Sequence, residues 1–489
     1  MGSEAKIELL PRSAEKEEQH QLLSRLWIES KQLWVVAGPA ILTRFSMYGT
    51  FVISQAFIGH IGNTELAGLS IVYHVLVKFS IGVMTGMSNG LGTLCGQAYG
   101  AKQYHMLGIY LQRFWLIEFF FCFLLLPLFI FSFPILKLLG QTEKISGMAN
   151  IISIWYIPIM ISHVFRYTIR IYLQTHGKNM VVTWSGVVTL ILQVICCWIF
   201  VGDMKMGVAG VMLAMNIASV IPVIGLLMYV FCGGCPQTWT GFSIHAFSDL
   251  WPMVKLSVSS GLMLCLEMWY NSVLILITGN IKNAEVAIDA LAICLNINGW
   301  AMVLSFGFLA AASVRVSNEL GKGSAKAAKF AIIVVVLTSL AIGFVLWALV
   351  MAFQHKISYI FSNSVEVANA FSDLSVLLAF SLLLNSIQPV LSGVAVGAGW
   401  QSKVVYINII CYYFVGLPLG VLLDYVGNLG VKGIWMGMIG GTLAQTLVLF
   451  YFTYKTNWDK QVSIAKARVN RLAIPSPDEL DNNNVPENN

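Results

Sequence analysis

Twelve apolar segments, each long enough to cross a membrane, occupy the chain between Trp34 and Tyr454. A helix needs about 20 apolar residues to span the hydrocarbon layer. Only 11% of the residues are charged, against about 25% in soluble globular proteins. The sequence therefore predicts an all-α polytopic membrane protein. The predicted helices lie near 34–58, 67–93, 107–132, 148–173, 181–201, 207–231, 252–278, 286–312, 327–353, 367–395, 403–424 and 430–453.

The loops between these segments are too short to hold a folded soluble domain, so the membrane part must carry the function. Lys and Arg gather in alternate loops and after the last segment, which predicts that those loops and both termini are cytoplasmic. Residues 1–31 are polar and of mixed charge, so we expect no removable signal peptide there. The polar tail from Pro475 is predicted to be disordered. The predicted parts are a cytoplasmic N-terminal segment (1–31), an N-lobe with helices 1–6 (32–231), a cytoplasmic inter-lobe loop (232–251), a C-lobe with helices 7–12 (252–453) and a cytoplasmic tail (454–489).

The second half of the chain repeats the first. Gln97–Gly100 aligns with Asn318–Gly321 at an offset of 221 residues, and Gly207–Gly210 aligns with Gly430–Gly433 at an offset of 223. Because each half holds six segments, both halves enter the membrane in the same orientation, which predicts a pseudo-twofold axis along the membrane normal. A substrate would then bind between two six-helix lobes, and rocking of one lobe against the other would give alternating access.

Small residues at four-residue spacing predict close contacts between helices. We favour general packing over a hinge role for any one of these glycines. Pro39 in the first segment and Pro389 in the tenth are the better candidates for bends that move. The glycines concerned are Gly82, Gly86, Gly90, Gly96, Gly100, Gly393, Gly397, Gly416, Gly420, Gly437 and Gly441.

Two carboxylates, Glu267 and Asp289, lie in apolar segments of the second half, and the aligned positions of the first half, near Gly49 and Leu69, hold none. A carboxylate in hydrocarbon is costly, so one that persists usually faces a partner, a cavity or an ion pathway. Burial penalises the charged form, and a second acid nearby adds to that penalty, so such groups can exchange protons. The alternatives are a structural acid paired with Lys or Arg for Glu267, and a boundary acid at the headgroups for Asp289.

Polar side chains near these acids are candidates for substrate binding. Tyr270 and Asn271 lie one helical turn from Glu267, and Asn296 lies two turns from Asp289. Trp300, Asn385 and Gln388 complete the predicted pocket of the C-lobe.

The apolar segments of the first half carry different polar residues. Glu118 is expected to form a structural pair with Arg113 or Lys78. Arg166 and Arg170 lie one turn apart near a cytoplasmic helix end, where long side chains can reach the headgroups. His163 aligns with Asn385, so a polar lining role and a proton-carrying role are both open.

Other functional classes lack their signatures. The chain contains no HExxH motif of a metal-dependent hydrolase and no phosphate-binding Gly-x4-Gly-Lys-Ser/Thr motif of an ATP-driven pump. Two acids in one lobe do not form the ring of charges that a channel filter needs. The single Cys232-x-x-Cys235 pair is weak as a zinc site, and we expect no metal and no other cofactor.

Four stretches resemble plant members of the multidrug and toxic compound extrusion (MATE, or detoxification) family: Ile53–Gly62, Leu94–Ala101, Val314–Gly321 and Val390–Gln401. The resemblance implies twelve helices in two lobes and export of organic compounds in exchange for protons or sodium. In plants it points to protons, with Glu267 as a carrier. The stretch Leu266–Asn271 is similar to the subgroup that moves flavonoid glycosides or alkaloids into the vacuole. Two departures are Gly92, where many relatives have Glu, and Asn385, where other plant branches have Asp.

We therefore expect a proton-coupled antiporter that exports flavonoid glycosides, alkaloids or xenobiotics from the cytosol, with Glu267 and Asp289 coupling transport to the proton gradient. The alternatives are a sodium-coupled or facilitative organic-solute carrier and an integral membrane enzyme. The expected partners are a small organic substrate, protons and the lipid bilayer, without nucleic acid, and the chain is expected to be a monomer. The vacuolar membrane is the first expected location and the plasma membrane the second.

Overall fold

A computed structural model describes residues 12–278, 285–360 and 364–474. Most of the described residues are helical, and eleven of the helical stretches are long and apolar enough to cross a membrane. The span expected near 252–278 is the helix α9 (Leu250–Thr278). All twelve predicted segments are therefore helical, which confirms the predicted fold class.

The N-lobe is built from α1 to α8. Two of its spans contain a short π-helical stretch, η1 (Val72–Val77) between α2 and α3, and η2 (Trp198–Asp203) after α7. The α-helices are α1 (Arg12–Ile61), α2 (Asn63–Ile71), α3 (Lys78–Gly100), α4 (Tyr104–Ile130), α5 (Ser132–Leu138), α6 (Glu143–Thr175), α7 (Asn179–Cys197) and α8 (Gly207–Tyr229).

The C-lobe follows a connection that contains the short helices η3 (Val230–Gly234) and η4 (Ile244–Phe247). Its eleventh span is interrupted by another π-helical stretch, η6 (Ile409–Gly416). The helices are α9, α10 (Glu285–Gly321), α11 (Ala325–Ile357), η5 (Ser358–Ile360), α12 (Val365–Ala398), α13 (Gln401–Asn408), α14 (Leu417–Tyr425), α15 (Val431–Lys455) and α16 (Trp458–Leu472).

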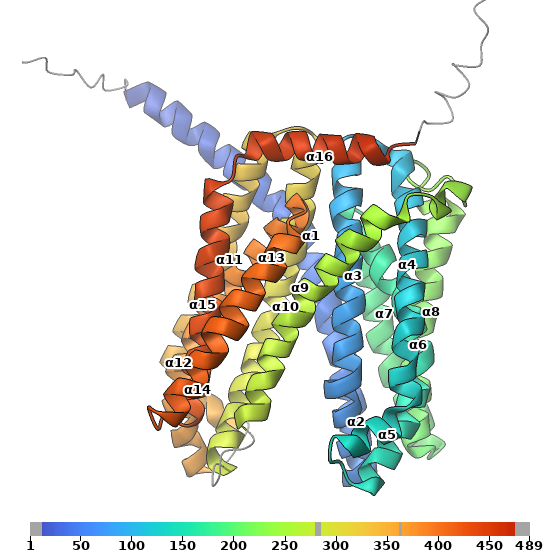
Figure 1. The fold of residues 1–489 in the computed structure, drawn as a ribbon, viewed down its shortest axis with the longest axis vertical. Coiled ribbons are helices and arrows are strands. Elements are labelled where there is room, and N and C mark those ends of the chain that lie inside the picture. The colour runs from blue at the N-terminus through green and yellow to red at the C-terminus, as the bar shows by residue number, and fades with distance from the viewer. Residues whose placement is uncertain (1–11, 279–284, 361–363, 475–489) are drawn as a thin grey trace, which may run out of the picture.

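The helix α16 lies across one end of the molecule, and the two lobes diverge toward the opposite end (Figure 1). We call the first the α16 end and the second the far end. The lobes meet along α3, which packs against α9 and α10, and along α1, which packs against α10. Phe120, Trp184 and Leu337 are among the apolar side chains that remain exposed on the outside of the lobes, as expected where lipid surrounds a protein.

The predicted glycine contacts are present. A Cβ atom on Gly86 of α3 would lie 2.6 Å from the Cα atom of Gly261 on α9, and one on Gly397 of α12 would lie 2.7 Å from the Ser313 carbonyl oxygen on α10. Within the C-lobe, a Cβ atom on Gly441 of α15 would lie 2.9 Å from the Cα atom of Gly416. These helices touch backbone to backbone, which only glycine allows.

We predict that Gly441→Val destabilises the protein by about 1–3 kcal/mol or more, because the new side chain has no room between α15 and η6. Thermal unfolding in detergent measures the loss. Gly225→Val is the matched control, since Gly225 is exposed on α8 and has no neighbour within 4 Å of its Cβ position. Equal melting temperatures for the two variants would contradict the close packing.

Candidate functional site

Hydrogen bonds between the lobes close the α16 end. The Thr93 hydroxyl on α3 donates to the Val396 carbonyl of α12 (2.6 Å) and accepts from the Gln401 amide (2.8 Å). Gln97 donates to the Gly397 carbonyl (3.2 Å). Asn318 on α10 donates to the Thr175 carbonyl at the end of α6 (3.2 Å). This set of contacts, the inter-lobe seam, consists of polar groups buried in close packing.

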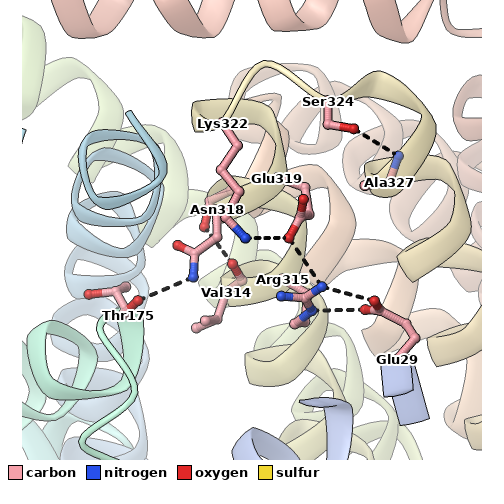
Figure 2. Close-up of polar contacts among 10 residues, drawn as sticks. Glu29, Thr175, Val314, Arg315, Asn318, Glu319, Lys322, Ser324 and Ala327 are labelled. Atoms are coloured by element: carbon pink, nitrogen blue, oxygen red, sulfur yellow. Dashed lines mark hydrogen bonds and ion pairs between the residues drawn. The ribbon is translucent and has the colours of Figure 1, made fainter. Parts of the chain in front are cut away.

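A buried charge network lies beside the seam. Arg315 on α10 forms a two-pronged ion pair with Glu29 of α1, with N···O distances of 2.8 and 2.9 Å. Glu319 accepts from Arg315 (3.2 Å) and from Lys322 (2.8 Å) (Figure 2). Because Glu29, Arg315 and Glu319 are all buried, each charge depends on its partners. The network holds the part of α1 around Glu29 against the last turns of α10.

The helix α16 connects both lobes at this end. Its Arg468 guanidinium donates to the Gln97 side chain on α3 (2.9 Å) and covers Gly399, whose φ of 80° ends α12. On the C-lobe side Trp458 packs against Trp400, with ring centroids 5.4 Å apart. On the N-lobe side the His105 ring donates to the Ile474 carbonyl (2.9 Å) just after the helix.

Burial lowers the pKa of the Arg468 guanidinium, and its partner is an uncharged amide. Sequence reasoning did not anticipate α16 because the segment is polar overall. Its apolar positions nevertheless follow helical spacing, and Trp458, Ala465, Val469 and Leu472 are buried.

Glu267 lies inside the C-lobe with 5% of its surface exposed. Gln388 of α12 is a hydrogen-bonding neighbour of its carboxylate, and the Tyr412 ring of η6 lies close enough to interact with its charge. Gln388 was predicted from the sequence as a substrate contact, whereas Tyr412 was not predicted as a site residue. The carboxylate thus lies where α9, α12 and the π-helical stretch η6 meet.

A chain of hydrogen bonds connects the helices around Glu267. The Tyr412 hydroxyl donates to Gln445 of α15 (2.7 Å), whose amide donates to Asn408 of α13 (2.7 Å), which in turn donates to the Met263 carbonyl of α9 (3.1 Å). Every one of these side chains is buried. A change in the charge of Glu267 would therefore act on groups that fix the packing of four helical segments.

Tyr270 belongs to the same cluster. Its ring stacks on Tyr412 with centroids 4.4 Å apart, and its hydroxyl donates to the Gly437 and Met438 carbonyls of α15 (3.3 and 3.2 Å). Gly416 and Gly441 leave the space that this hydroxyl occupies. Tyr270 and Gln388, two of the predicted substrate contacts, therefore lie in the cluster around Glu267.

The other predicted C-lobe residues lie elsewhere. Asn385 donates to Asn298 (2.9 Å) beside a cavity of about 30 Å³, large enough for a water molecule. Trp300 packs against Phe45 and Tyr48 of α1, with ring centroids 5.0 and 4.7 Å apart, and so faces the N-lobe.

Asn296 lies on α10 and is in contact with neighbouring groups. Asn271 and Asp289 lie on α9 and α10, but their side chains fall outside the described part of the structure. The predicted meeting of Asp289 with Glu267 therefore stays a prediction.

The N-lobe encloses a larger cavity of about 270 Å³, which we call the N-lobe cavity. It lies among α1, η1, α3, α6, α7 and α8, with Phe306 of α10 at its wall. Its charged and titratable lining consists of Arg44, Tyr48, Tyr73, Tyr156, His163, Arg166, Tyr167 and Arg170.

Two expectations for the N-lobe were wrong. Arg166 and Arg170 do not extend to a helix end; they line the N-lobe cavity, because Arg166 lies nine residues before the end of α6 and its donors point inward to the Ser219 carbonyl (2.7 Å). Glu118 forms no ion pair with Arg113 or Lys78. It accepts from Ser88 instead (2.6 Å), while Arg113 donates to the His245 carbonyl (3.0 Å).

A model of the MatE family matches residues 39–199 and 260–422, well over half of the chain. The chain belongs to the MATE family. The two matches begin at residues 39 and 260, so they are 221 residues apart, which is the offset of the internal repeat. Protein DETOXIFICATION 20 of Arabidopsis thaliana is 54% identical over 461 residues, 94% of each chain. Protein DETOXIFICATION 21 of the same plant is 53% identical over 478 residues, 97% of each chain.

The fold agrees with solved MATE structures. The crystal structure of the eukaryotic MATE transporter AtDTX14 superposes with a TM-score of 0.85 at 29% identity, covering 91% of this chain and 99% of that one. MATE proteins are transporters and not enzymes, and they act on small molecules within a membrane. The alternative of an integral membrane enzyme is thereby removed.

In this MATE protein we predict that Glu29→Gln destabilises the fold by about 3 kcal/mol, because it leaves Arg315 buried with only Glu319 as a counter-charge. The control is Asp373→Asn, which breaks the exposed pair with Lys432 and should cost less than about 1 kcal/mol. Thermal unfolding in detergent compares the two. A Glu29 variant as stable as the Asp373 variant would show that the buried network does not hold the seam.

We predict that Tyr412→Phe destabilises the C-lobe by about 1–3 kcal/mol, because it removes the donor to the buried Gln445 side chain. Tyr406→Phe, on the exposed face of α13, should change stability by less than about 0.5 kcal/mol. The same unfolding assay measures both. No difference between them would mean that the hydrogen-bond chain around Glu267 contributes nothing to packing.

Proposed function

We propose that this chain is a proton-coupled antiporter that exports organic compounds from the cytosol by alternating access, with Glu267 as the proton carrier. Membership of the MATE family supports transport as the activity. The observation that carries the coupling is the burial of Glu267 at the junction of α9, α12 and η6, next to Tyr412 and Gln388.

The mechanism follows from the surroundings of the carboxylate. In its charged form Glu267 accepts hydrogen bonds, and in its neutral form it can also donate one. Protonation therefore rearranges the donors around it, which include Gln388 and extend through Tyr412 to α15 and α13. Because glycines pack α15 tightly against η6, a shift at Tyr412 or Tyr270 has to move these segments.

The orientation in the membrane is part of the proposal. The α16 end carries Lys322, Lys403, Lys466 and Arg471, so the positive-inside bias places this end in the cytosol. The inter-lobe seam then closes the cytosolic side, and the state described is the one that releases substrate on the other side of the membrane. Opening of the seam would admit substrate from the cytosol.

Flavonoid glycosides, alkaloids or xenobiotics are the proposed substrates, with the vacuolar membrane as the first location and the plasma membrane as the second. Trp300, Asn385, Gln388, Tyr270, Asn271 and Asn296 are the proposed substrate contacts in the C-lobe, and Asp289 is proposed as a second proton-coupling group. The relatives named DETOXIFICATION support a role in removing organic compounds.

The test is transport of a labelled substrate in proteoliposomes under an imposed pH gradient. We expect Glu267→Gln to lose most of the gradient-driven transport, about tenfold or more, while exchange of labelled for unlabelled substrate at equal pH continues. Glu118→Gln is the matched control, because Glu118 is also buried and its Gln replacement can still accept from Ser88.

Undiminished dependence on the pH gradient in Glu267→Gln would overturn Glu267 as the carrier. A sodium gradient, imposed in place of the pH gradient, separates the proposal from sodium coupling. Transport that responds to neither gradient in the wild-type protein would identify a facilitative carrier.

A further inference from the structure

We propose that the N-lobe cavity binds the acidic group of an aromatic organic anion, with Arg44, Arg166 and Arg170 as the recognising cations. This inference rests on the proposed transport of organic compounds and names the chemical class of substrate. It concerns arginines that the sequence analysis placed at a helix end and that line a cavity formed mostly by N-lobe helices.

The charge of the cavity is the first observation. Three guanidinium groups from α1 and α6 line it, and its described lining contains no carboxylate. None of the ion pairs among the described residues involves these arginines. Arg170 lies close enough to Arg44 and to Arg166 for like-charge repulsion. Like charges gathered in a low-dielectric site are unfavourable unless a counter-charge enters.

The existing partners of the arginines leave donors available. Arg166 donates to the Ser219 carbonyl (2.7 Å). Arg44 lies over the Phe306 ring at 5.2 Å, and Arg170 lies over the Tyr167 ring at the same distance. Contacts with ring faces use the charge of a guanidinium but not its five N–H donors. Such a group can bind a carboxylate or a sulfate with two parallel hydrogen bonds.

Aromatic walls define the rest of the ligand. Phe51 and Tyr73 stack with centroids 3.4 Å apart, and His163 packs between Tyr156 and Tyr167 (6.1 and 5.0 Å). The neighbouring hydroxyls of Tyr167 and Thr85 are buried and have no further hydrogen-bond partner among the described residues. They offer polar contacts to a phenolic or hydroxylated ligand.

The volume sets the size of the bound group. About 270 Å³ lies near the lower limit of about 300 Å³ for ligand pockets, so the cavity suits one aromatic ring with its acidic group. A larger conjugate would extend past Tyr48, which lines the cavity and also contacts Trp300 of the C-lobe. Trp300 thus lies on the side of the cavity toward which a larger ligand would extend, next to the C-lobe.

Binding of probes to the purified full-length protein in nanodiscs tests the assignment. The probes are 4-hydroxycinnamate, its uncharged methyl ester and the cation tyramine, compared by isothermal titration at neutral pH. We expect the acid to bind more tightly than the ester by about tenfold or more, because a charged hydrogen bond is lost in the ester. Tyramine should bind more weakly than either.

Substitutions locate the site. Arg170→Gln should weaken binding of the acid by about tenfold and leave binding of the ester unchanged. The affinity of Arg170→Lys for the acid should lie between those of the wild-type protein and Arg170→Gln. Arg25→Gln is the matched control, since Arg25 also lies over a ring, that of Phe330 (5.1 Å), but outside the cavity. If Arg170→Gln does not fold, Arg44→Gln is measured in the same way.

Several results would overturn the inference: no binding of the acid, equal affinities for acid and ester, tighter binding of tyramine, or Arg170→Gln behaving like Arg25→Gln. Glu267→Gln should retain binding of the acid, because that carboxylate lies in the other lobe. Arginine-dependent binding of the acid without gradient-driven transport would therefore refute the proposed proton coupling and leave the anion site intact. Gradient-driven transport without arginine-dependent binding of the acid would refute the anion site and leave the proton coupling intact.

Membrane potential gives a second readout. An anion that leaves the cytosol and a proton that enters both move positive charge inward, so a cytosol-negative potential should accelerate export of 4-hydroxycinnamate. Export of the uncharged ester should respond less, because only the proton then carries charge. Equal responses for the two probes would contradict export of the charged form.

Discussion

The structure depends on the close approach of α3 and α10 at the α16 end. Gly100 lies against the Asn318 carbonyl and Gly321 against the Gln97 carbonyl, so any side chain at either glycine would separate the lobes. Lipid is as apolar as the helix surfaces, so burial alone does not select which helices meet in a membrane. Close backbone packing and the hydrogen bonds of Thr93, Gln97 and Asn318 make that selection here. An interface of this kind can separate without exposing a large apolar surface to water.

Hydropathy located every span but underestimated two of the helices that form the seam. The predicted segments end at 93 and 312, whereas α3 continues to Gly100 and α10 to Gly321. The added turns carry polar residues such as Gln97, Asn318 and Glu319, and each turn packs against the other lobe. The internal repeat already marked these turns, since Gln97–Gly100 and Asn318–Gly321 are the pair that revealed it. A repeated polar motif next to an apolar segment thus indicates a buried contact that hydropathy misses.

The sequence identified Glu267 through the cost of a charge in hydrocarbon, but it could not supply the surroundings of that residue. Tyr412, Asn408 and Gln445 come from segments more than a hundred residues away, and no local pattern connects them with α9. The arginines of the N-lobe were visible in the sequence and were misjudged, because helix position alone does not tell whether a side chain points to lipid headgroups or inward. The repeat alignment held the better clue: His163 and Asn385, which it pairs, each line a cavity in their own lobe.

The division of charge between the lobes has a physical reason under the proposed mechanism. An arginine next to Glu267 would hold the carboxylate in its charged form and oppose the uptake of a proton. With the cations in the N-lobe cavity and the acid in the C-lobe, one lobe can hold an anionic substrate while the other takes up a proton. Coupling must then pass through inter-lobe contacts. Trp269, two residues from Glu267, stacks on Phe79 of α3 with centroids 5.6 Å apart, and Trp300 contacts Tyr48 at the wall of the N-lobe cavity. Both tryptophans lie on helices of the C-lobe, so a movement of α9 or α10 that follows protonation would be transmitted to the lobe that holds the substrate.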